Sequence, residues 1–289
     1  MKKWSFVTFA AFMFAGCSSI QPAATGPAPM LQAMPASAPH AAGKTEVLWL
    51  GQSATRITTP GGKVIVIDPY LVNNPKTPPE FKNLDALGKV DLILVTRAHG
   101  DHFEDAPPLA NKHKIPIIAP QGLQSALISL NLVPEAQAYR MGKGGTATPL
   151  TGIKVTMVHA DHDSELTWKD PVTGKRTTYA GGEPVGYIIE MENGFKIWHT
   201  GDTGPFSDMR LIGETHRPDL VMLPIGSHFV LSPEQAAMAL REWMKPKYVL
   251  PIHYGTTPQL RGTPAELKAA LGNSAVQMLA VDPGQKVEF

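Results

Sequence analysis

The sequence predicts a mixed α/β (α+β) fold, and three observations support that prediction. Between residues 45 and 67, β-rich runs are separated by turn residues, which is typical of antiparallel strands. From about residue 90 onward, short apolar runs of strand length alternate with segments of helical spacing. Several of these strands end in clusters of His and Asp. We therefore expect a sheet-based fold with a polar site where strands meet loops.

The composition describes a chain that can bury a substantial core. It has 289 residues, of which 43% are hydrophobic, and this length allows one α/β domain or two smaller ones. The formal net charge is +1 and no long basic block occurs, so we expect no nucleic-acid partner. The ten histidines are more informative than the balanced acids and bases.

Residues 1–16 are predicted to be a signal peptide. Lys2 and Lys3 precede an apolar stretch, residues 4–15, that is shorter than the roughly 20 residues of a membrane-spanning helix. The small residues before Cys17 resemble a bacterial lipoprotein signal, which implies cleavage before Cys17 and lipid attachment to it. Because Ser18 follows, the resemblance implies a lipid anchor in the outer membrane of the cell envelope, facing the periplasm. The alternative is an ordinary cleaved signal peptide with an incidental cysteine.

Residues 17–43 are predicted to form a disordered tether that precedes a folded domain over residues 44–289. The segment is rich in Ala and Pro and almost free of charge, which disfavours helix and sheet. We expect His40, within it, to be solvated. Cys17 is the only cysteine, so the domain has neither a disulfide nor a thiolate for a metal.

The folded domain begins with predicted antiparallel sheet. Its strands are Thr45–Leu50, Thr55–Thr59 and Val64–Ile67, the last two joined by the turn Pro60–Lys63. The third strand ends at Asp68. An acid in this position usually caps a turn, but it can also orient a metal ligand, and both roles remain open.

The next predicted elements alternate between strand and helix. A buried strand over Val90–Val95 leads into Thr96–His102, which reads Thr-Arg-Ala-His-Gly-Asp-His. A helix over Glu104–Lys114, a strand over Ile115–Ala119 and a helix over Gln121–Leu130 follow. The glycine-rich residues 141–145 are predicted to be a hairpin loop, because they lack the Gly-Lys-Ser/Thr ending of a phosphate-binding loop.

The second half continues this alternation. A strand over Ile153–Val158 is followed by a predicted polar loop through Trp168 and Lys175. Helices are predicted to begin at Ser232 and Thr263, because each is an N-cap followed by proline at the first helical position. The other predicted strands are Val185–Met191, Phe195–Trp198, Pro218–Pro224, Tyr248–Ile252 and Val276–Val281.

Four polar clusters follow strands at equivalent positions. They are Thr96–His102, His159–Ser164, His199–Thr203 and His253–Gly255. The carboxyl ends of strands can converge on one side of a sheet, so we expect these clusters to form one site. A lone histidine is usually a surface or core residue, whereas four such clusters favour a metal site.

The clusters resemble the signature of the metallo-β-lactamase superfamily. The most specific motifs are His99-Gly100-Asp101-His102, Ala160-Asp161-His162, Thr200-Gly201-Asp202-Thr203 and Pro251-Ile252-His253-Tyr254-Gly255. The resemblance covers about residues 45–289 and implies a single-domain, four-layer αββα sandwich. Residues 206–209 and 218–226 look like the branch containing ascorbate-6-phosphate lactonase-like hydrolases and N-acyl-phosphatidylethanolamine phospholipase D.

The resemblance also implies a set of metal ligands. It assigns Asp101, His102 and His253 to one metal, His99 and His162 to the other, and Asp202 to a bridging position. These donors suit Zn²⁺, which lowers the pKa of a bound water to about 7 and so provides hydroxide at neutral pH. Mn²⁺ is the alternative metal.

The remaining histidines have lesser predicted roles. His162 matches the expected spacing better than His159, which is therefore a neighbour of the site. His199 is expected to support Asp202, and His228, in the exit loop of a strand, is expected to bind substrate. We expect His113 and His216 at the surface.

Arg97 departs from the superfamily pattern, because it stands where a first histidine would bind the same metal as His99 and His162. A guanidinium has no acceptor lone pair and stays protonated. At an effective dielectric of about 20, unit charges about 4 Å apart repel by roughly 4 kcal/mol, so occupancy of that metal site should fall. We expect one metal per chain, with two as the alternative.

Three hypotheses follow from Arg97. The leading one is a zinc-dependent hydrolase that cleaves an ester, lactone or phosphodiester bond in a small-molecule or lipid-like substrate. Asp101 and Asp202 then act at the metal, and Arg97 binds a substrate phosphate or carboxylate. The second is a catalytically disabled periplasmic binding protein on the same fold. The third is that Arg97 points away and both metals bind.

Overall fold

The computed structural model describes residues 43–289. The predicted signal peptide, the lipid-attachment residue Cys17, and the predicted tether up to residue 42 lie outside the described residues. All described residues belong to one compact unit, as the single-domain prediction requires. Within this part of the chain, no helix combines the length and the apolar composition needed to cross a bilayer.

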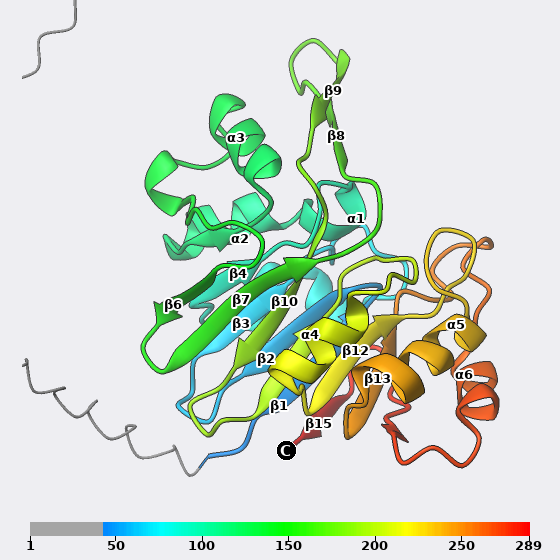
Figure 1. Cartoon of the computed structure of the whole chain (residues 1–289). Helices are drawn as coiled ribbons and strands as arrows, with labels where there is room; N and C mark the ends of the chain where they lie inside the picture. The colour runs from blue at the N-terminus through cyan, green and yellow to red at the C-terminus, as the bar shows by residue number, and fades with distance from the viewer. Residues whose placement is uncertain (1–42) are drawn as a thin grey trace, which may run out of the picture. The chain divides into compact units, whose positions relative to one another are not determined.

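Two β-sheets form the centre of the domain (Figure 1). The first contains, in spatial order, β15 (Lys286–Glu288), β1 (Glu46–Gly51), β2 (Ala54–Thr58), β3 (Val64–Ile67), β4 (Leu92–Leu94) and β5 (Ile117–Ile118). The second contains β14 (Gln277–Met278), β13 (Tyr248–Ile252), β12 (Leu220–Pro224), β11 (Lys196–His199), β10 (Val185–Glu190), β7 (Ile153–His159) and β6 (Thr146–Leu150). The predicted strands thus divide between two sheets.

Helices cover the outer face of each sheet (Figure 1). On the first sheet they are α1 (Gly100–Phe103), α2 (Ala106–His113) and α3 (Gln121–Ser129). On the second they are α4 (Met209–His216), α5 (Pro233–Met238), its π-helical continuation (Ala239–Met244) and α6 (Pro264–Leu271). Short 3₁₀ turns occupy Pro79–Lys82, Leu84–Leu87 and Glu135–Gln137.

Three apolar clusters confirm the four-layer αββα order. One packs the first sheet against its helices and includes Ile93 of β4 and Leu109 of α2. A second fills the space between the sheets, where Ile65 and Tyr187 lie. The third packs the second sheet against its helices and includes Trp198. Strands in this arrangement are buried on both faces, which explains their nearly continuous apolar sequences.

Parallel pairing brings several strand ends to one edge. β3, β4 and β5 are parallel to one another, as are β11, β12, β13 and β14. Asp68 follows β3, Thr96 lies beyond β4, and Asp202 and His253 follow β11 and β13. The predicted convergence of polar strand ends therefore has a structural basis.

Helix boundaries agree in part with the predictions. Ser232 and Thr263 are N-caps with complete capping boxes, as the sequence indicates. The predicted helix over Glu104–Lys114 is confirmed as α2, which is shorter by two residues at its start and one at its end, and the short helix α1 precedes it, beginning within the predicted Thr96–His102 cluster. β6, α4 and β15 are present although no sequence pattern predicted them.

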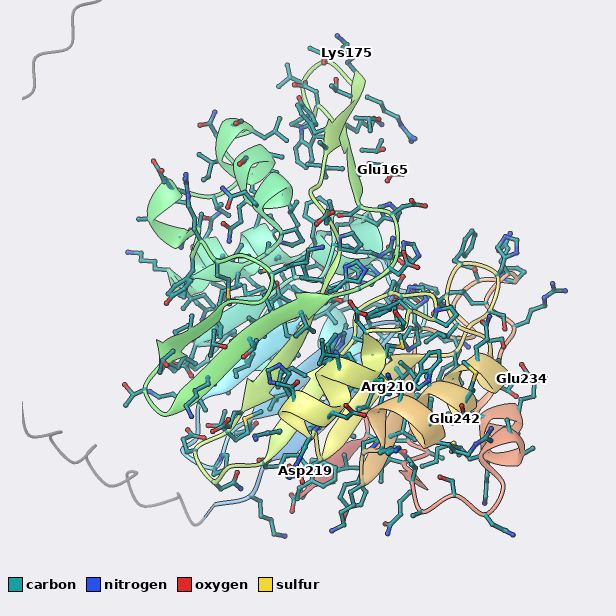
Figure 2. All side chains as sticks on the ribbon, viewed as in Figure 1. Glu165, Lys175, Arg210, Asp219, Glu234 and Glu242 are labelled. Carbon is teal, nitrogen blue, oxygen red and sulfur yellow. The ribbon has the colours of Figure 1, made fainter. Side chains whose placement is uncertain are left out.

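The predicted polar loop through Trp168 and Lys175 is wrong. This segment forms a hairpin of β8 (Glu165–Lys169) and β9 (Arg176–Ala180), and its apolar side chains pack against the first-sheet cluster. Apart from Ala180, the exposed positions of the two strands carry Thr and charged residues, so the hairpin has a polar sequence. Figure 2 shows Glu165 at the base of the hairpin and Lys175 at its tip.

Tyr187 links the two sheets through its hydroxyl group. It is fully buried in β10 and donates a hydrogen bond to the carbonyl oxygen of Val95, 2.8 Å away beyond β4. We expect Tyr187→Phe to lower the free energy of unfolding by about 1–2 kcal/mol, because a buried carbonyl loses a donor. Urea denaturation measures this loss. Tyr70→Phe, which removes an exposed hydroxyl contact, is the control; equal effects of both substitutions would contradict the prediction.

Candidate metal centre

Four donor side chains converge where the strands end. Asp101, His102, Asp202 and His253 each offer a ligand atom, and these atoms all lie within 4.8 Å of one another. Asp101 and His102 are on α1, whereas Asp202 and His253 follow β11 and β13. His102 Nε2 and His253 Nε2 lie 3.2 and 2.9 Å from Asp202 Oδ2. The structure thus brings together one of the two predicted ligand sets.

Asp68 orients His102 from behind. Its Oδ2 accepts hydrogen bonds from His102 Nδ1 and Thr96 Oγ1, both at 2.7 Å, and its Oδ1 accepts one from the Thr96 amide, also at 2.7 Å. The proton on Nδ1 leaves Nε2 to face the other donors. Asp68 therefore combines both roles left open by the sequence, because it holds a backbone turn and orients a histidine.

The charges around His102 favour its protonated form when no metal is bound. Burial alone would lower its pKa, but Asp202 and Asp68 outweigh burial and raise the pKa of His102 to about 10. Binding a metal at Nε2 must then displace a proton. Burial likewise opposes ionisation of Asp101, but His102, His253 and Arg97 hold the pKa of that carboxyl far below its usual range.

Gln52 is a site residue that the sequence analysis missed. It lies in the tight turn between β1 and β2 and is 3% exposed. Its amide nitrogen donates to Asp101 Oδ2 at 2.8 Å and lies 2.7 Å from His253 Nε2. The His253 amide also donates to the Gln52 carbonyl at 3.0 Å. A turn glutamine matches no metal-binding motif, so its sequence carries no signal for this role.

Arg97 points into the site. Its side chain is 4% exposed, and Nη2 donates to Asp202 Oδ2 at 2.6 Å. Nη1 contacts His99 Nδ1 and lies 3.4 Å from His162 Nδ1. The hypothesis that Arg97 points away is therefore wrong. The guanidinium touches the three residues that the resemblance associates with the second metal.

His99 and His162 are consequently engaged by protein groups. His99 receives Arg97 at Nδ1, and its Nε2 lies 3.3 Å from Glu165 Oε2 at the base of the β8–β9 hairpin. Burial and the Arg97 charge lower the pKa of His99, which favours the neutral ring. His162 Nδ1 accepts the Asp163 amide at 2.7 Å. Neither ring belongs to the four-donor cluster.

Asp202 connects the two halves of the site. It is fully buried, and although burial opposes its ionisation, Arg97, His253 and His102 hold its pKa well below the usual value. His199 supports its loop, since His199 Nδ1 accepts the Gly201 amide at 3.2 Å and Nε2 lies 3.0 Å from the Ser53 carbonyl. This arrangement agrees with the supporting role predicted for His199.

The other predicted histidines lie outside the cluster. His159 is exposed and packs edge-on against Phe206. His113 and His216 are partly buried at the carboxyl ends of α2 and α4. His228 is exposed and packs edge-on against Phe229, and Phe229 rather than His228 lines the pocket over the cluster.

The four-donor cluster fits a divalent metal. Two imidazole nitrogens and two carboxylates are the mixed N/O set that zinc accepts. Asp202 Oδ1 is buried and has no hydrogen-bond partner among the described residues, so it has lone pairs to offer. The His99–His162 side does not fit a second metal in this conformation, because a guanidinium lies among its donors.

The fold and the site define a metallohydrolase of the metallo-β-lactamase fold. A family model described as a β-lactamase superfamily domain matches residues 63–254. The chain is 61% identical over 270 residues to a UPF0173 metal-dependent hydrolase of Cupriavidus necator, an alignment that covers 92% of this chain and 93% of the relative. The protein therefore belongs to the UPF0173 metal-dependent hydrolases of the β-lactamase superfamily.

More distant relatives agree with this assignment. A UPF0173 metal-dependent hydrolase of Rubrobacter xylanophilus is 44% identical over 226 residues, covering 78% of this chain and 88% of the relative. The solved structure of Igni18, described as a novel metallo hydrolase from Ignicoccus hospitalis, is 29% identical. It superposes with a TM-score of 0.71 and covers 85% of this chain and 98% of that chain.

The Asp68 contact predicts a measurable change in metal affinity. We expect Asp68→Asn to weaken Zn²⁺ binding by about 10- to 100-fold, the usual effect of losing a carboxylate that orients a metal-binding histidine. Competition with a chromogenic chelator measures the affinity. Asp219→Asn is the matched control, because Asp219 accepts a backbone amide at the start of β11, away from the cluster. An unchanged affinity in a folded Asp68→Asn protein would show that Asp68 has only a backbone role.

Proposed function

We propose that this protein is a hydrolase with one catalytic metal, in which Arg97 replaces the second cation. The observation that carries the proposal is the position of the guanidinium, which contacts His99, His162 and Asp202 together. A second metal beside these groups would be repelled by the positive charge of the guanidinium. The proposed metal ligands are Asp101, His102, Asp202 and His253.

The metal and the protein side chains have separate proposed tasks. When bound, Zn²⁺ lowers the pKa of a coordinated water to about 7 and supplies the nucleophile at neutral pH. Asp68 and Gln52 hold the ligands, and Asp202 balances the charge between Arg97 and the two histidines. Arg97 stabilises the negative charge that develops on the substrate.

The pocket above the cluster suits a small substrate with an anionic or carbonyl group. Its volume is about 330 Å³, and Arg97, His99, His162 and Asp101 are among the residues that line it. An ester, lactone or phosphodiester presents an oxygen that Arg97 can hydrogen-bond while the bond next to it is broken. We propose Zn²⁺ as the metal, with Mn²⁺ as the alternative.

Metal stoichiometry in wild type and Arg97→His tests this proposal. We expect about one tightly bound Zn²⁺ per wild-type chain and about two in Arg97→His, because the substitution restores an imidazole donor and removes a cation. Elemental analysis of the purified proteins measures the ratio. Arg210→His, at an exposed arginine of α4 (Figure 2), is the control and should not change it.

A panel of chromogenic esters, lactones and phosphodiesters completes the test. Hydrolysis by the wild type that is lost on chelation and restored by Zn²⁺ supports the proposal. Two tightly bound zinc ions in the wild type would overturn the single-metal assignment. Activity in Arg97→His alone would indicate a disabled enzyme, and no activity in either protein would favour a binding protein on the same fold.

We also propose that Cys17 is lipidated and anchors the protein in the bacterial outer membrane, facing the periplasm. The support is the charged, apolar and small-residue order of the first 17 residues. Labelled palmitate should be incorporated into the wild type, and Cys17→Ser should be unlabelled and released from membranes by cell fractionation. A labelled Cys17→Ser protein, or an unlabelled wild type, would contradict the anchor.

A further inference from the structure

The pocket above the metal cluster is lined by two chemically different kinds of residue. Its lining includes the charged and polar groups of the site, among them Arg97 and Asp101. It also includes Phe229, Thr257 and Leu260, which supply a benzyl ring, a methyl group and an isobutyl group. A substrate of only polar atoms would leave these apolar groups without a complementary partner.

The apolar part of this lining is fixed to the backbone of a proposed metal ligand. A Cβ at Gly226 would lie 2.4 Å from the carbonyl oxygen of His253, so only glycine allows this approach. The Gly262 amide donates to the Gly226 carbonyl at 3.2 Å, and the Gly255 amide donates to the Leu260 carbonyl at 2.8 Å. The loops that carry Phe229 and Leu260 are therefore locked to each other and to His253.

Phe229 is held in an exposed position by a strained turn. Ser227 and His228 both have positive φ, at 61° and 54°, and the Phe229 amide donates to the Ser227 carbonyl in a three-residue turn. The His228 ring packs edge-on against Phe229, with ring centroids 4.4 Å apart. Strain of this kind is usually retained at functional sites.

The exposure of Phe229 is unusual for this chain. Its side chain is 53% exposed, and only Val72, Val172 and Leu211 are comparable large apolar side chains among the described residues. None of those three lines the pocket over the metal cluster. A phenyl ring exposed to water does not contribute the favourable free energy of burial, and a bound apolar group that covers the ring would provide it.

From these observations we propose that Phe229 and Leu260 form a subsite for an apolar substituent of the substrate, such as a medium-length acyl chain. This inference rests on the proposed hydrolase function and narrows its substrate to molecules with a hydrolysable polar group joined to an apolar one. The polar group lies beside Arg97 and the metal ligands, and the apolar group covers Phe229. The volume of about 330 Å³ favours a chain of medium length over a full-length lipid tail. His228 acts here by supporting the ring of Phe229.

The test compares p-nitrophenyl acetate with p-nitrophenyl octanoate on the zinc-loaded protein. The wild type should have a higher kcat/KM for the octanoate ester than for the acetate ester. Phe229→Ala should lower kcat/KM about tenfold for the octanoate ester and less than about twofold for the acetate ester. Phe229→Leu should keep most of the preference, because it restores an apolar side chain. Leu211→Ala removes another exposed apolar side chain, on α4 outside this pocket, and should behave as wild type. Circular dichroism confirms that each variant is folded.

A second measurement separates this inference from the proposed function. Calorimetric titration with free octanoate, which has no ester bond to hydrolyse, should show binding. Phe229→Ala should weaken this binding, and Leu211→Ala should not. If neither ester is hydrolysed but the binding of free octanoate depends on Phe229, the apolar subsite is supported and the proposed ester hydrolysis is contradicted. If the esters are hydrolysed without dependence on chain length or on Phe229, the hydrolase stands and the subsite is overturned. Absence of both activity and Phe229-dependent binding also overturns the subsite.

Discussion

The buried ion pair between Arg97 and Asp202 is the interaction on which the site depends. Asp202 is 1% exposed, and a carboxylate at that depth needs compensating charge or strong donors. Arg97 Nη2 supplies both at 2.6 Å from Oδ2, the same oxygen that His102 and His253 contact. Removing one partner of such a pair typically costs about 3–5 kcal/mol, because the other charge remains buried. The Arg97 side chain therefore provides part of the positive charge that the buried Asp202 carboxylate requires.

Backbone strain is concentrated around the same cluster. Among the described residues, nine non-glycine residues have positive φ; Gln52, Asp68 and His253 belong to the centre, and Ser227 and His228 immediately precede the pocket residue Phe229. Three of the others end helices, where a left-handed residue is common. The strand ends thus turn sharply to aim side chains at one point, and the packing between the two sheets holds those turns in place.

The sequence predicted the parts of this arrangement that depend on local pattern. Buried strands such as Leu220–Pro224 are apolar throughout, so their positions and the polar residues after them were evident. The β8–β9 hairpin was missed because most of its outward positions are Thr or charged residues, and only Leu166 is fully buried. Gln52 was missed for another reason: its role arises from contact with Asp101 and His253, which are distant in sequence. A contact between residues that are distant in sequence produces no periodic pattern from which it could be predicted.

In the proposed single-metal centre, an arginine lies where a second metal would bind. A guanidinium donates hydrogen bonds and stabilises negative charge, but it cannot bind water as a ligand or lower its pKa, so in this proposal the nucleophile would arise at the four-donor cluster. Unlike a metal ion, it neither dissociates nor exchanges, so the charge beside Asp202 is independent of metal supply. The same guanidinium contacts Nδ1 of both His99 and His162, and these two rings also line the pocket. Because Arg97, His102 and His253 all contact Oδ2 of Asp202, this one oxygen couples the guanidinium directly to the proposed metal ligands.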